Sequence, residues 1–176
     1  MKPSIYSSTL VCTLLIGSCG GTSAPDSDKA SGVLPGGAQA AAMPAALWSA
    51  TPIADPREVR DLREAGKDGD AVIVRGTLQD FGELSTFRLV DDALLDCTEM
   101  GEKDHCSEPW DYCCADPDEL QQLTVNVEFL EDGLPGEWSL SGQNGLDRLS
   151  EVVVAGTLRK DEAGNLRIEA TRMSLQ

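Results

Sequence analysis

The 176-residue chain carries 30 acidic and 14 basic side chains and a single histidine, which gives a formal net charge of −16. Nucleic-acid binding requires a basic surface that neutralises phosphates, so this charge balance argues against a nucleic-acid partner. The same negative field repels anionic lipid headgroups, so any attachment to a membrane must come from something other than surface charge.

The N-terminus has the pattern of a bacterial export signal. Lys2 precedes a mostly apolar run over residues 5–16, which is shorter than the roughly 20 residues that span a bilayer. The next residues, Ile16-Gly17-Ser18-Cys19, follow the lipobox order of an aliphatic residue, two small residues and a cysteine. We therefore expect residues 1–18 to be a cleaved signal peptide and Cys19 to carry the lipid. The alternative is an ordinary signal with a chance cysteine.

A second segment, residues 19–54, is rich in Gly, Ala, Pro and Ser. Such a composition buries too little apolar surface to offset chain entropy and is typical of a flexible tether. Within it, residues 38–47 are compatible with a transient helix, and Trp48 is compatible with docking on the folded domain. The domain itself is expected over residues 55–176, which is long enough for one core.

Residues 55–176 predict a mostly β domain that begins with one short helix. Asp55-Pro56-Arg57-Glu58 is expected to open the helix, with Asp55 as the cap and Glu58 completing a capping box, and Gly66 is expected to end it. Beyond it, apolar and polar residues alternate with period two, which is typical of half-buried strands. The alternating segments are 72–78, 87–89, 123–129, 152–158 and 166–170.

Two of these strands share a glycine at the same place. Val72-Ile-Val-Arg-Gly76-Thr-Leu78 matches Val152-Val-Val-Ala-Gly156-Thr-Leu158 at a constant offset. A glycine inside a strand permits a sharp bend or a close approach of two backbones, as in a small barrel. The alternative is a coincidence between two β-rich segments.

The last two strands form a hairpin. Lys160–Asn165 predicts its turn, with Gly164 or Asn165 taking a positive φ, and the shifted phase of Met173 predicts a bulge near Thr171-Arg172. Five strands, a glycine-bent first strand and a closing hairpin resemble an OB-fold, a small Greek-key barrel. A small β-sandwich is the alternative.

A cysteine-rich insertion, residues 92–122, is expected between the second and third strands. It holds four cysteines, Cys97, Cys106, Cys113 and Cys114, and the histidine, His105. An even number of cysteines in an oxidising compartment predicts two disulfides, each joining Cys113 or Cys114 to Cys97 or Cys106.

Two other uses of these cysteines remain open. One is a zinc or copper site with three or four cysteine ligands and His105 as a further candidate, although the spacing differs from the close ligand pairs of structural zinc sites. The other is a redox-active pair in which Cys113 and Cys114 form a strained vicinal disulfide. Residues 91–120 also carry eleven acids and one base, which indicates a solvated acidic surface or a site for a cation or a basic partner.

The block Pro109-Trp110-Asp111-Tyr112-Cys113-Cys114, with Cys97 and Cys106 upstream, resembles a group of uncharacterised bacterial exported OB-fold-like lipoproteins. The resemblance covers roughly residues 70–176 and implies the fold, but it implies no activity. Trp110 and Tyr112 face the same side of an extended segment. They are expected either to anchor the insertion on the barrel or to contact a ligand.

The sequence contains no nucleophile elbow, zinc-protease motif or phosphate-binding loop. We therefore expect a non-enzymatic envelope lipoprotein without a cofactor, held by its lipid on the periplasmic side of the inner or outer membrane. Its OB-like domain would bind a small ligand, a glycan or an envelope protein. The alternative is a metal-binding or thiol-redox protein that uses the cysteine block.

Overall fold

A computed structural model describes residues 41–99 and 111–176 of this protein. The predictions for the signal peptide, for Cys19 and for His105, Cys106 and Trp110 concern residues outside these ranges. No helix within the described ranges is long and apolar enough to cross a bilayer.

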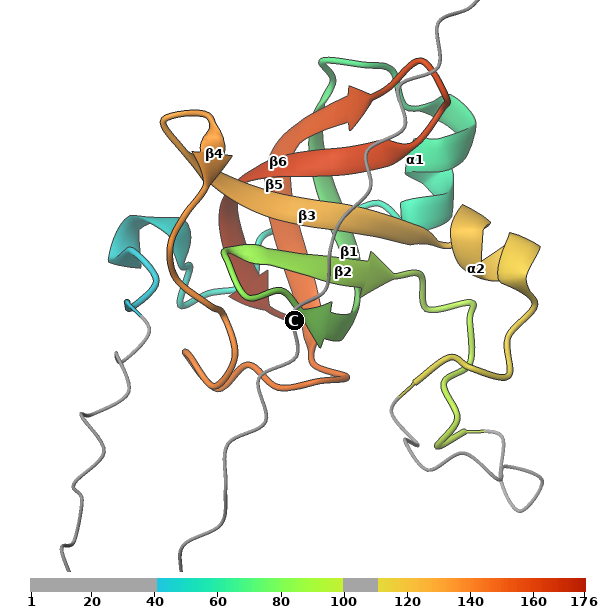
Figure 1. Cartoon of the computed structure of the whole chain (residues 1–176), viewed down its shortest axis with the longest axis horizontal. Coiled ribbons are helices and arrows are strands. Elements are labelled where there is room, and N and C mark those ends of the chain that lie inside the picture. Colours follow the sequence, from blue (N-terminus) through green and yellow to red (C-terminus); the bar gives the residue numbers. More distant parts are fainter. Residues whose placement is uncertain (1–40, 100–110) are drawn as a thin grey trace, which may run out of the picture. The chain divides into compact units, whose positions relative to one another are not determined.

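Five strands close a barrel, as Figure 1 shows. β1 pairs with β2 and β5, β5 pairs with β6, β6 runs parallel to β3, and β3 returns to β2. This is the strand order of an OB-fold, so the predicted five-stranded OB-fold-like barrel is confirmed and the β-sandwich is not. The strands are β1 (Ala71–Phe81), β2 (Thr86–Val90), β3 (Thr124–Glu131), β5 (Glu151–Lys160) and β6 (Leu166–Leu175), with a two-residue β4 (Leu134–Pro135) beside β3.

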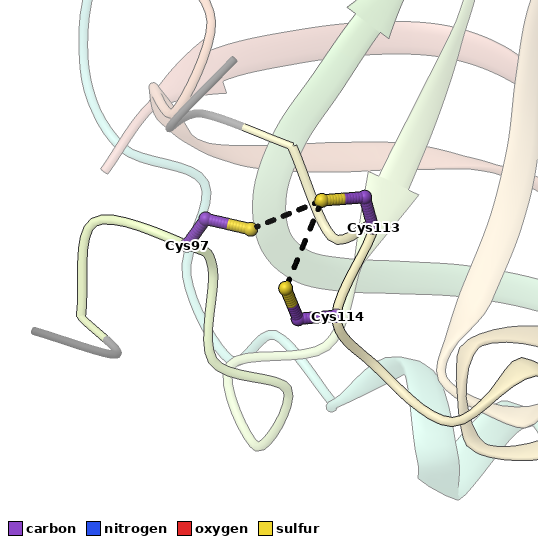
Figure 2. A group of neighbouring side chains, drawn as sticks. All are labelled: Cys97, Cys113 and Cys114. Atoms are coloured by element: carbon purple, nitrogen blue, oxygen red, sulfur yellow. Dashed lines mark hydrogen bonds between the residues drawn. The ribbon is translucent and has the colours of Figure 1, made fainter. Parts of the chain in front are cut away.

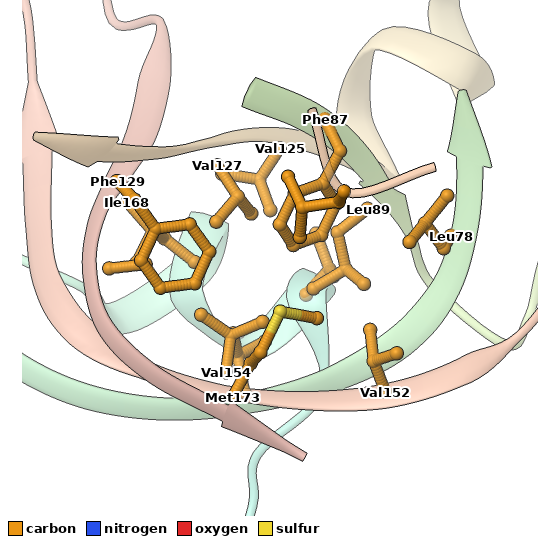
Figure 3. Packing of buried hydrophobic residues seen from close by; sticks show 14 of the residues in the cluster. Leu78, Phe87, Leu89, Val125, Val127, Phe129, Val152, Val154, Ile168 and Met173 are labelled. Carbon is orange, nitrogen blue, oxygen red and sulfur yellow. The ribbon is translucent and has the colours of Figure 1, made fainter. Parts of the chain in front are cut away.

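The core lies inside the barrel and is made by the inward half of each alternating strand (Figure 3). Because successive strand residues point to opposite faces, every second residue reaches the core. The predicted inward residues Val72, Val74 and Leu78 are buried, whereas Ile73, Arg75 and Thr77 between them are partly exposed. Other core residues include Phe87, Leu89, Val125, Val127, Phe129, Val152, Val154, Leu158, Ile168 and Met173.

The two repeated glycines lie at close backbone approaches, as predicted. A β-carbon on Gly76 would overlap the carbonyl oxygen of Val90, and one on Gly156 would overlap that of Glu169. β1 pairs with β5 from Ala71 to Thr77 and with β2 from Thr77 onward, so Gly76 lies directly before the exchange of partners. The shared glycine therefore reflects a shared steric need, and it allows β1 to contribute to both sides of the barrel.

The closing hairpin also follows the prediction. Gly164 has a φ of 85°, and the Asp161 side chain accepts hydrogen bonds from the backbone and side-chain nitrogens of Asn165. In β6, Arg172 pairs with Ala155 and Ala170 pairs with Gly156, so Thr171 is the extra residue of the predicted bulge.

Two short α-helices flank the barrel. α1 (Val59–Ala65) begins three residues later than expected: its cap is Glu58, whose backbone N–H donates to Asp61, while Asp55 has a φ of 57° and lies outside the helix. α2 (Pro117–Gln122) ends the insertion, and its cap Asp116 accepts from the backbone nitrogens of Asp118 and Glu119. The acids at this helix start are thus explained by capping.

The expected boundary between tether and domain at residue 55 is wrong. Residues 41–54 pack against the barrel through the buried side chain of Met43 and a short 3₁₀ turn, η1 (Ala45–Leu47). Trp48 forms a bridge to β6 and packs on the core, and the Ser49 N–H donates to the carbonyl oxygen of Met173 at 2.8 Å. The docking expected of Trp48 is confirmed, and the rest of the predicted tether lies outside the described residues.

Candidate functional site

A groove runs across the outer face of the barrel over β2, β3 and β6. Three hollows of about 410, 400 and 200 Å³ meet there and share Asn126. The groove extends from Gly82 in the β1–β2 loop to Asp161 and Asn165 in the β5–β6 loop. In OB-folds this face and these two loops form the usual ligand-binding surface.

Strand register builds a row of polar side chains along this groove. Arg88 of β2 is the direct partner of Asn126 of β3, Asn126 pairs with Arg167 of β6, and Arg167 pairs with Arg159 of β5. Paired residues on neighbouring strands point to the same face, so the four side chains form one band across the outside of the barrel.

The groove concentrates positive charge in an acidic protein. Among the described residues, five cations and four carboxylates line it, so this lining is slightly positive, whereas the whole chain has a net charge of −16. The cations are Arg63, Arg88, Arg159, Lys160 and Arg167, and the carboxylates are Asp68, Asp80, Glu128 and Asp161.

Most of these arginines already have strong partners. Arg167 pairs with Glu128 at 3.0 Å and with Glu169 at 3.4 Å, and Arg159 pairs with Glu169 at 2.8 Å. These ion pairs hold two guanidinium groups in place across the strands.

Arg63, on α1, also has partners at the edge of the groove. It donates to the carbonyl oxygens of Gln122 and Thr124 at 2.9 and 3.1 Å. Burial lowers its pKa. Its role is to join α1 to the start of β3.

Arg88 differs from the other arginines of the groove. Within the described residues no carboxylate lies within 4 Å of its guanidinium, and its one hydrogen bond is a long contact of 3.5 Å to Oε1 of Gln79. Gln79 in turn donates to Asp111 of the insertion at 3.2 Å. Arg88 is therefore an exposed cation, oriented by a neutral amide, with its donors available to an anion.

The structure brings three of the four predicted cysteines together (Figure 2). Cys97 Sγ lies 3.6 Å from Cys113 Sγ, which lies 3.8 Å from Cys114 Sγ. Both separations exceed the roughly 2.05 Å of a disulfide bond. Cys97 is buried, and Cys113 and Cys114 are exposed.

Tyr112 is an anchor of the insertion. Its side chain is 3% exposed and packs with Val90 and Leu94 in a small cluster beside the barrel. Burial and the nearby charges of Asp96, Glu99 and Asp92 raise the pKa of its hydroxyl. Tyr112 thus packs the insertion onto the barrel, the first of its two expected roles, and contact with a ligand stays a prediction.

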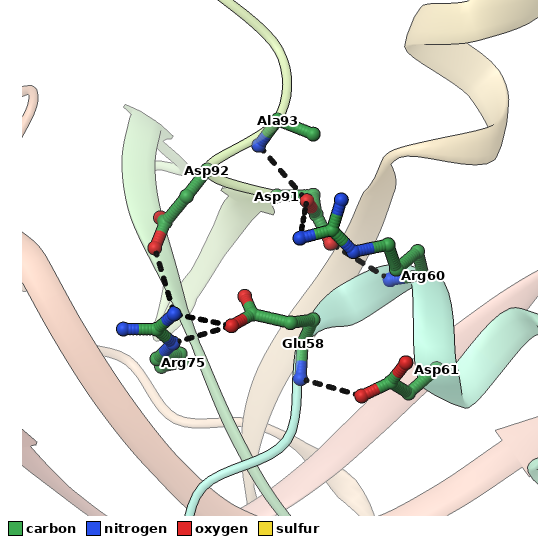
Figure 4. A network of polar contacts seen from close by, with 7 residues as sticks. All are labelled: Glu58, Arg60, Asp61, Arg75, Asp91, Asp92 and Ala93. Atoms are coloured by element: carbon green, nitrogen blue, oxygen red, sulfur yellow. Dashed lines mark hydrogen bonds and ion pairs between the residues drawn. The ribbon is translucent and has the colours of Figure 1, made fainter.

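A network of charged side chains at the N-terminus of α1 holds neighbouring elements together (Figure 4). Arg75 donates to Glu58 through both Nε and Nη2, and Nη2 also lies 3.8 Å from Asp92. The carboxylate of Asp91, fully buried, accepts from the backbone nitrogens of Arg60 and Ala93, each at 2.9 Å. These bonds join α1, β1 and the start of the insertion.

Comparison with known proteins adds nothing about activity. No family model and no curated protein matches the sequence. Among solved structures, the chain is similar to an aspartyl-tRNA synthetase from Entamoeba histolytica, with 12% identity and a TM-score of 0.43, covering 81% of this chain and 28% of that one. A protein described as an aspartyl-tRNA synthetase from Leishmania major Friedlin gives 10% identity and a TM-score of 0.40, covering 74% and 24%. The chain thus spans about a quarter of the length of these two synthetases.

The groove residues were missed by sequence reasoning, which concentrated on the cysteine block. A usable signal was present: Arg88, Asn126 and Arg167 all occupy outward positions between buried residues of alternating strands. Only the strand register shows that these three positions are neighbours.

Proposed function

We propose that this protein is a lipid-anchored, non-enzymatic binding protein of the bacterial envelope whose barrel takes an acidic oligosaccharide in the β2–β3–β6 groove. The anchoring part rests on the export signal and the lipobox at Cys19. The binding part rests on the groove, and above all on Arg88, whose guanidinium faces solvent without an acidic partner among the described residues.

The chemistry of the lining favours a sugar that carries carboxylates. Thr86, Asn126 and Asn165 offer uncharged donors and acceptors suited to hydroxyl groups, and Glu128 and Asp80 add acceptors. Arg88 adds a planar fork of donors that matches a carboxylate in two parallel hydrogen bonds. A chain of uronic acid residues combines both kinds of group.

A single-stranded nucleic acid fits the groove less well. Such ligands need successive phosphates to be neutralised and bases to stack on exposed aromatic rings. Here Phe87 is buried in the core and Phe81 is only partly exposed, and carboxylates interrupt the cations.

The ion pairs beside Arg88 favour binding by keeping the groove in one shape. Arg167 and Arg159 are fixed by Glu128 and Glu169, so a ligand does not have to order those long side chains. The conformational cost of binding is lower when side chains are already held in place.

The test is calorimetric titration of the full chain, in detergent, with hexagalacturonate as the probe. The variant is Arg88→Gln, and the matched control is Arg172→Gln. Arg172 is also an exposed strand arginine, but it lies outside the groove, and the charge change is identical. We expect R88Q to weaken binding about tenfold or more, the size of a lost charged hydrogen bond, and R172Q to change it less than twofold.

Two results would contradict the proposal. Equal weakening by R88Q and R172Q would mean that overall charge, and not the groove, attracts the probe. Tighter binding of a single-stranded oligonucleotide than of hexagalacturonate would mean that the groove binds nucleic acid in preference to acidic oligosaccharides.

A further inference from the structure

The three sulfur atoms of the insertion have the separations of ligands on one metal ion. Two thiolates 2.3 Å from a common zinc ion at the tetrahedral angle lie about 3.8 Å apart. The Cys97–Cys113 and Cys113–Cys114 Sγ distances are 3.6 and 3.8 Å, and all three sulfurs lie within 4.8 Å of one another. Figure 2 shows the three sulfur atoms turned toward one another.

The fold holds these residues together from two distant places in the sequence. The Cys97 N–H donates to the carbonyl oxygen of Asp111 at 3.0 Å, which ties the two arms of the insertion together. The buried Tyr112 then fixes the second arm, and the Ala115 N–H donates to the Tyr112 carbonyl oxygen at 3.0 Å. Cys113 and Cys114 occupy the middle of that turn, so their side chains project from a fixed base.

The turn explains how adjacent cysteines can serve one site. In an extended strand, neighbouring side chains point to opposite faces, which makes an adjacent pair a poor ligand set. In the turn between Tyr112 and Ala115 the two Sγ atoms come within 3.8 Å of each other and flank one side of Cys97. The direct adjacency of Cys113 and Cys114, which would argue against a shared metal ion in an extended segment, is therefore compatible with one here.

The surrounding charge also favours a cation. The described parts of the acidic segment 91–120, which are residues 91–99 and 111–120, contain eight acids and no base. The field of these acids raises the local concentration of a divalent ion. Thiolates supply the selectivity, because soft sulfur ligands prefer zinc and copper(I) to calcium or magnesium.

We infer that Cys97, Cys113 and Cys114 form a three-thiolate site for a thiophilic cation, zinc or copper(I). On binding, three S–H bonds are lost as three protons and three sulfur–metal bonds form, with no change of oxidation state. The site is separate from the groove and goes beyond the proposed binding function. It would stabilise the insertion and fix the segment that contains Asp111.

The test is metal titration of the reduced full chain under argon, with a competing chelator. Zinc is followed by its amount per chain, and cobalt(II), which replaces zinc, by its thiolate charge-transfer absorption. We expect one equivalent of zinc at neutral pH, released on acidification as protons displace the metal from the thiolates. A parallel titration with copper(I) shows which of the two ions the site prefers.

Cys114→Ser is the central variant. Because Cys114 is exposed, the substitution should leave the fold of the protein intact. It should weaken zinc binding at least tenfold and reduce the charge-transfer band, as should C113S. The double variant D118N/E119Q is the matched control, since it removes two exposed acids of the insertion and no thiol. It should change zinc affinity less than threefold.

Three outcomes would overturn the inference. One is loss of binding in D118N/E119Q equal to that in C114S, which would assign the ion to carboxylates. Another is unchanged zinc binding in C114S and C113S. The last is failure of the reduced chain to take up either metal.

Discussion

Asp91 and Asp92 are adjacent in the sequence and have opposite surroundings. The buried carboxylate of Asp91 accepts from two backbone nitrogens and lies 3.6 Å from the guanidinium of Arg60. Asp92, about one third exposed, faces Glu58 and Asp91 as well as Arg75. Burial and the charge of Glu58 raise the pKa of Asp92, and Arg75 only partly offsets them.

The raised pKa of Asp92 predicts a specific pH dependence. A carboxyl whose pKa is higher in the folded chain binds its proton more tightly there than in the unfolded chain. Its contribution to stability is therefore lost as pH rises from its unfolded pKa of about 3.9 through the higher folded value. Asp92→Asn removes this loss, so D92N should gain stability relative to the parent chain as the pH rises above about 4, and the gain should level off once the carboxyl has ionised in the folded chain. The gain should be below about 1 kcal/mol because the group is partly exposed.

Urea denaturation at several pH values measures this difference. Asp132→Asn is the control, since it makes the same charge change at an exposed turn residue. If the difference between D92N and the parent chain does not grow with pH, or if D132N gives the same growth, the assignment to Asp92 is wrong.

At the residue scale, the sequence predicted the roles that depend on neighbouring residues, but not those that depend on distant segments. The positive φ predicted for Gly164 or Asn165 depends only on the residues of that turn, so local chemistry was sufficient, and Gly164 takes it. Tyr112 stayed undecided because its surroundings, Val90 and Leu94, come from another segment. The cap of α1 shifted from Asp55 to Glu58 for the same reason: Arg75, on β1, holds Glu58 in place.

Among the elements, β1 is restricted by a close approach of its backbone to that of β2 at Gly76. It pairs with β5 along its first half and with β2 along its second, and it bends at Gly76. The β-carbon of any other residue at this position would meet the backbone of β2, which cannot rotate away as a side chain can. A register shift at Gln79 follows three residues later.

Gly76→Ala should therefore destabilise the barrel by about 2 kcal/mol or more, at the upper end of the usual cost of overpacking. Thr77→Ala, one residue along the same strand and partly exposed, is the control and should cost less than about 1 kcal/mol. Guanidinium denaturation of both variants gives the comparison. A cost for G76A no larger than that for T77A would mean that β1 relaxes freely at this point.

Elements were the scale at which sequence patterns predicted most. The inward residues, the two glycines and the bulge at Thr171 all follow from the period of two and from the point where it changes phase. The sequence of a single strand does not show which strand it pairs with or in which register. The row of Arg88, Asn126 and Arg167 could not be predicted, because it depends on the register of three strands that are far apart in the sequence.

At the scale of the whole molecule, the domain is larger than composition indicated. Met43 is buried and its backbone N–H donates to the side chain of Gln143, while Ile53 donates to Ser174. The Gly- and Ala-rich composition concealed this because only a few side chains, among them Met43, Leu47 and Trp48, pack on the core. The average composition of a segment does not reveal a few buried side chains.

Met43→Ala should cost about 2–3 kcal/mol of folding free energy, as large-to-small changes at buried sites do. Leu134→Ala is the matched control, because Leu134 is 71% exposed and its truncation should cost less than about 0.5 kcal/mol. Thermal or urea unfolding of the two variants decides the matter. Equal losses of folding free energy in the two variants would mean that residues 41–54 belong to the flexible tether and not to the folded domain.

Closure of the barrel by the parallel pair of β3 and β6 also constrains how the chain folds. Asn126 must meet Arg167, and Ser49 must meet Met173, so β6 is needed by both the early and the middle parts of the domain. Contacts between residues so distant in sequence are opposed by the entropy of closing long loops, and proteins rich in such contacts fold in milliseconds to seconds. The core can close only once β6 has paired with both β3 and β5, and until then the edges of β3 and β5 are open to other chains. Slow, late closure is thus a property of this strand order, and a chain truncated before residue 166 would have neither a closed core nor a complete groove.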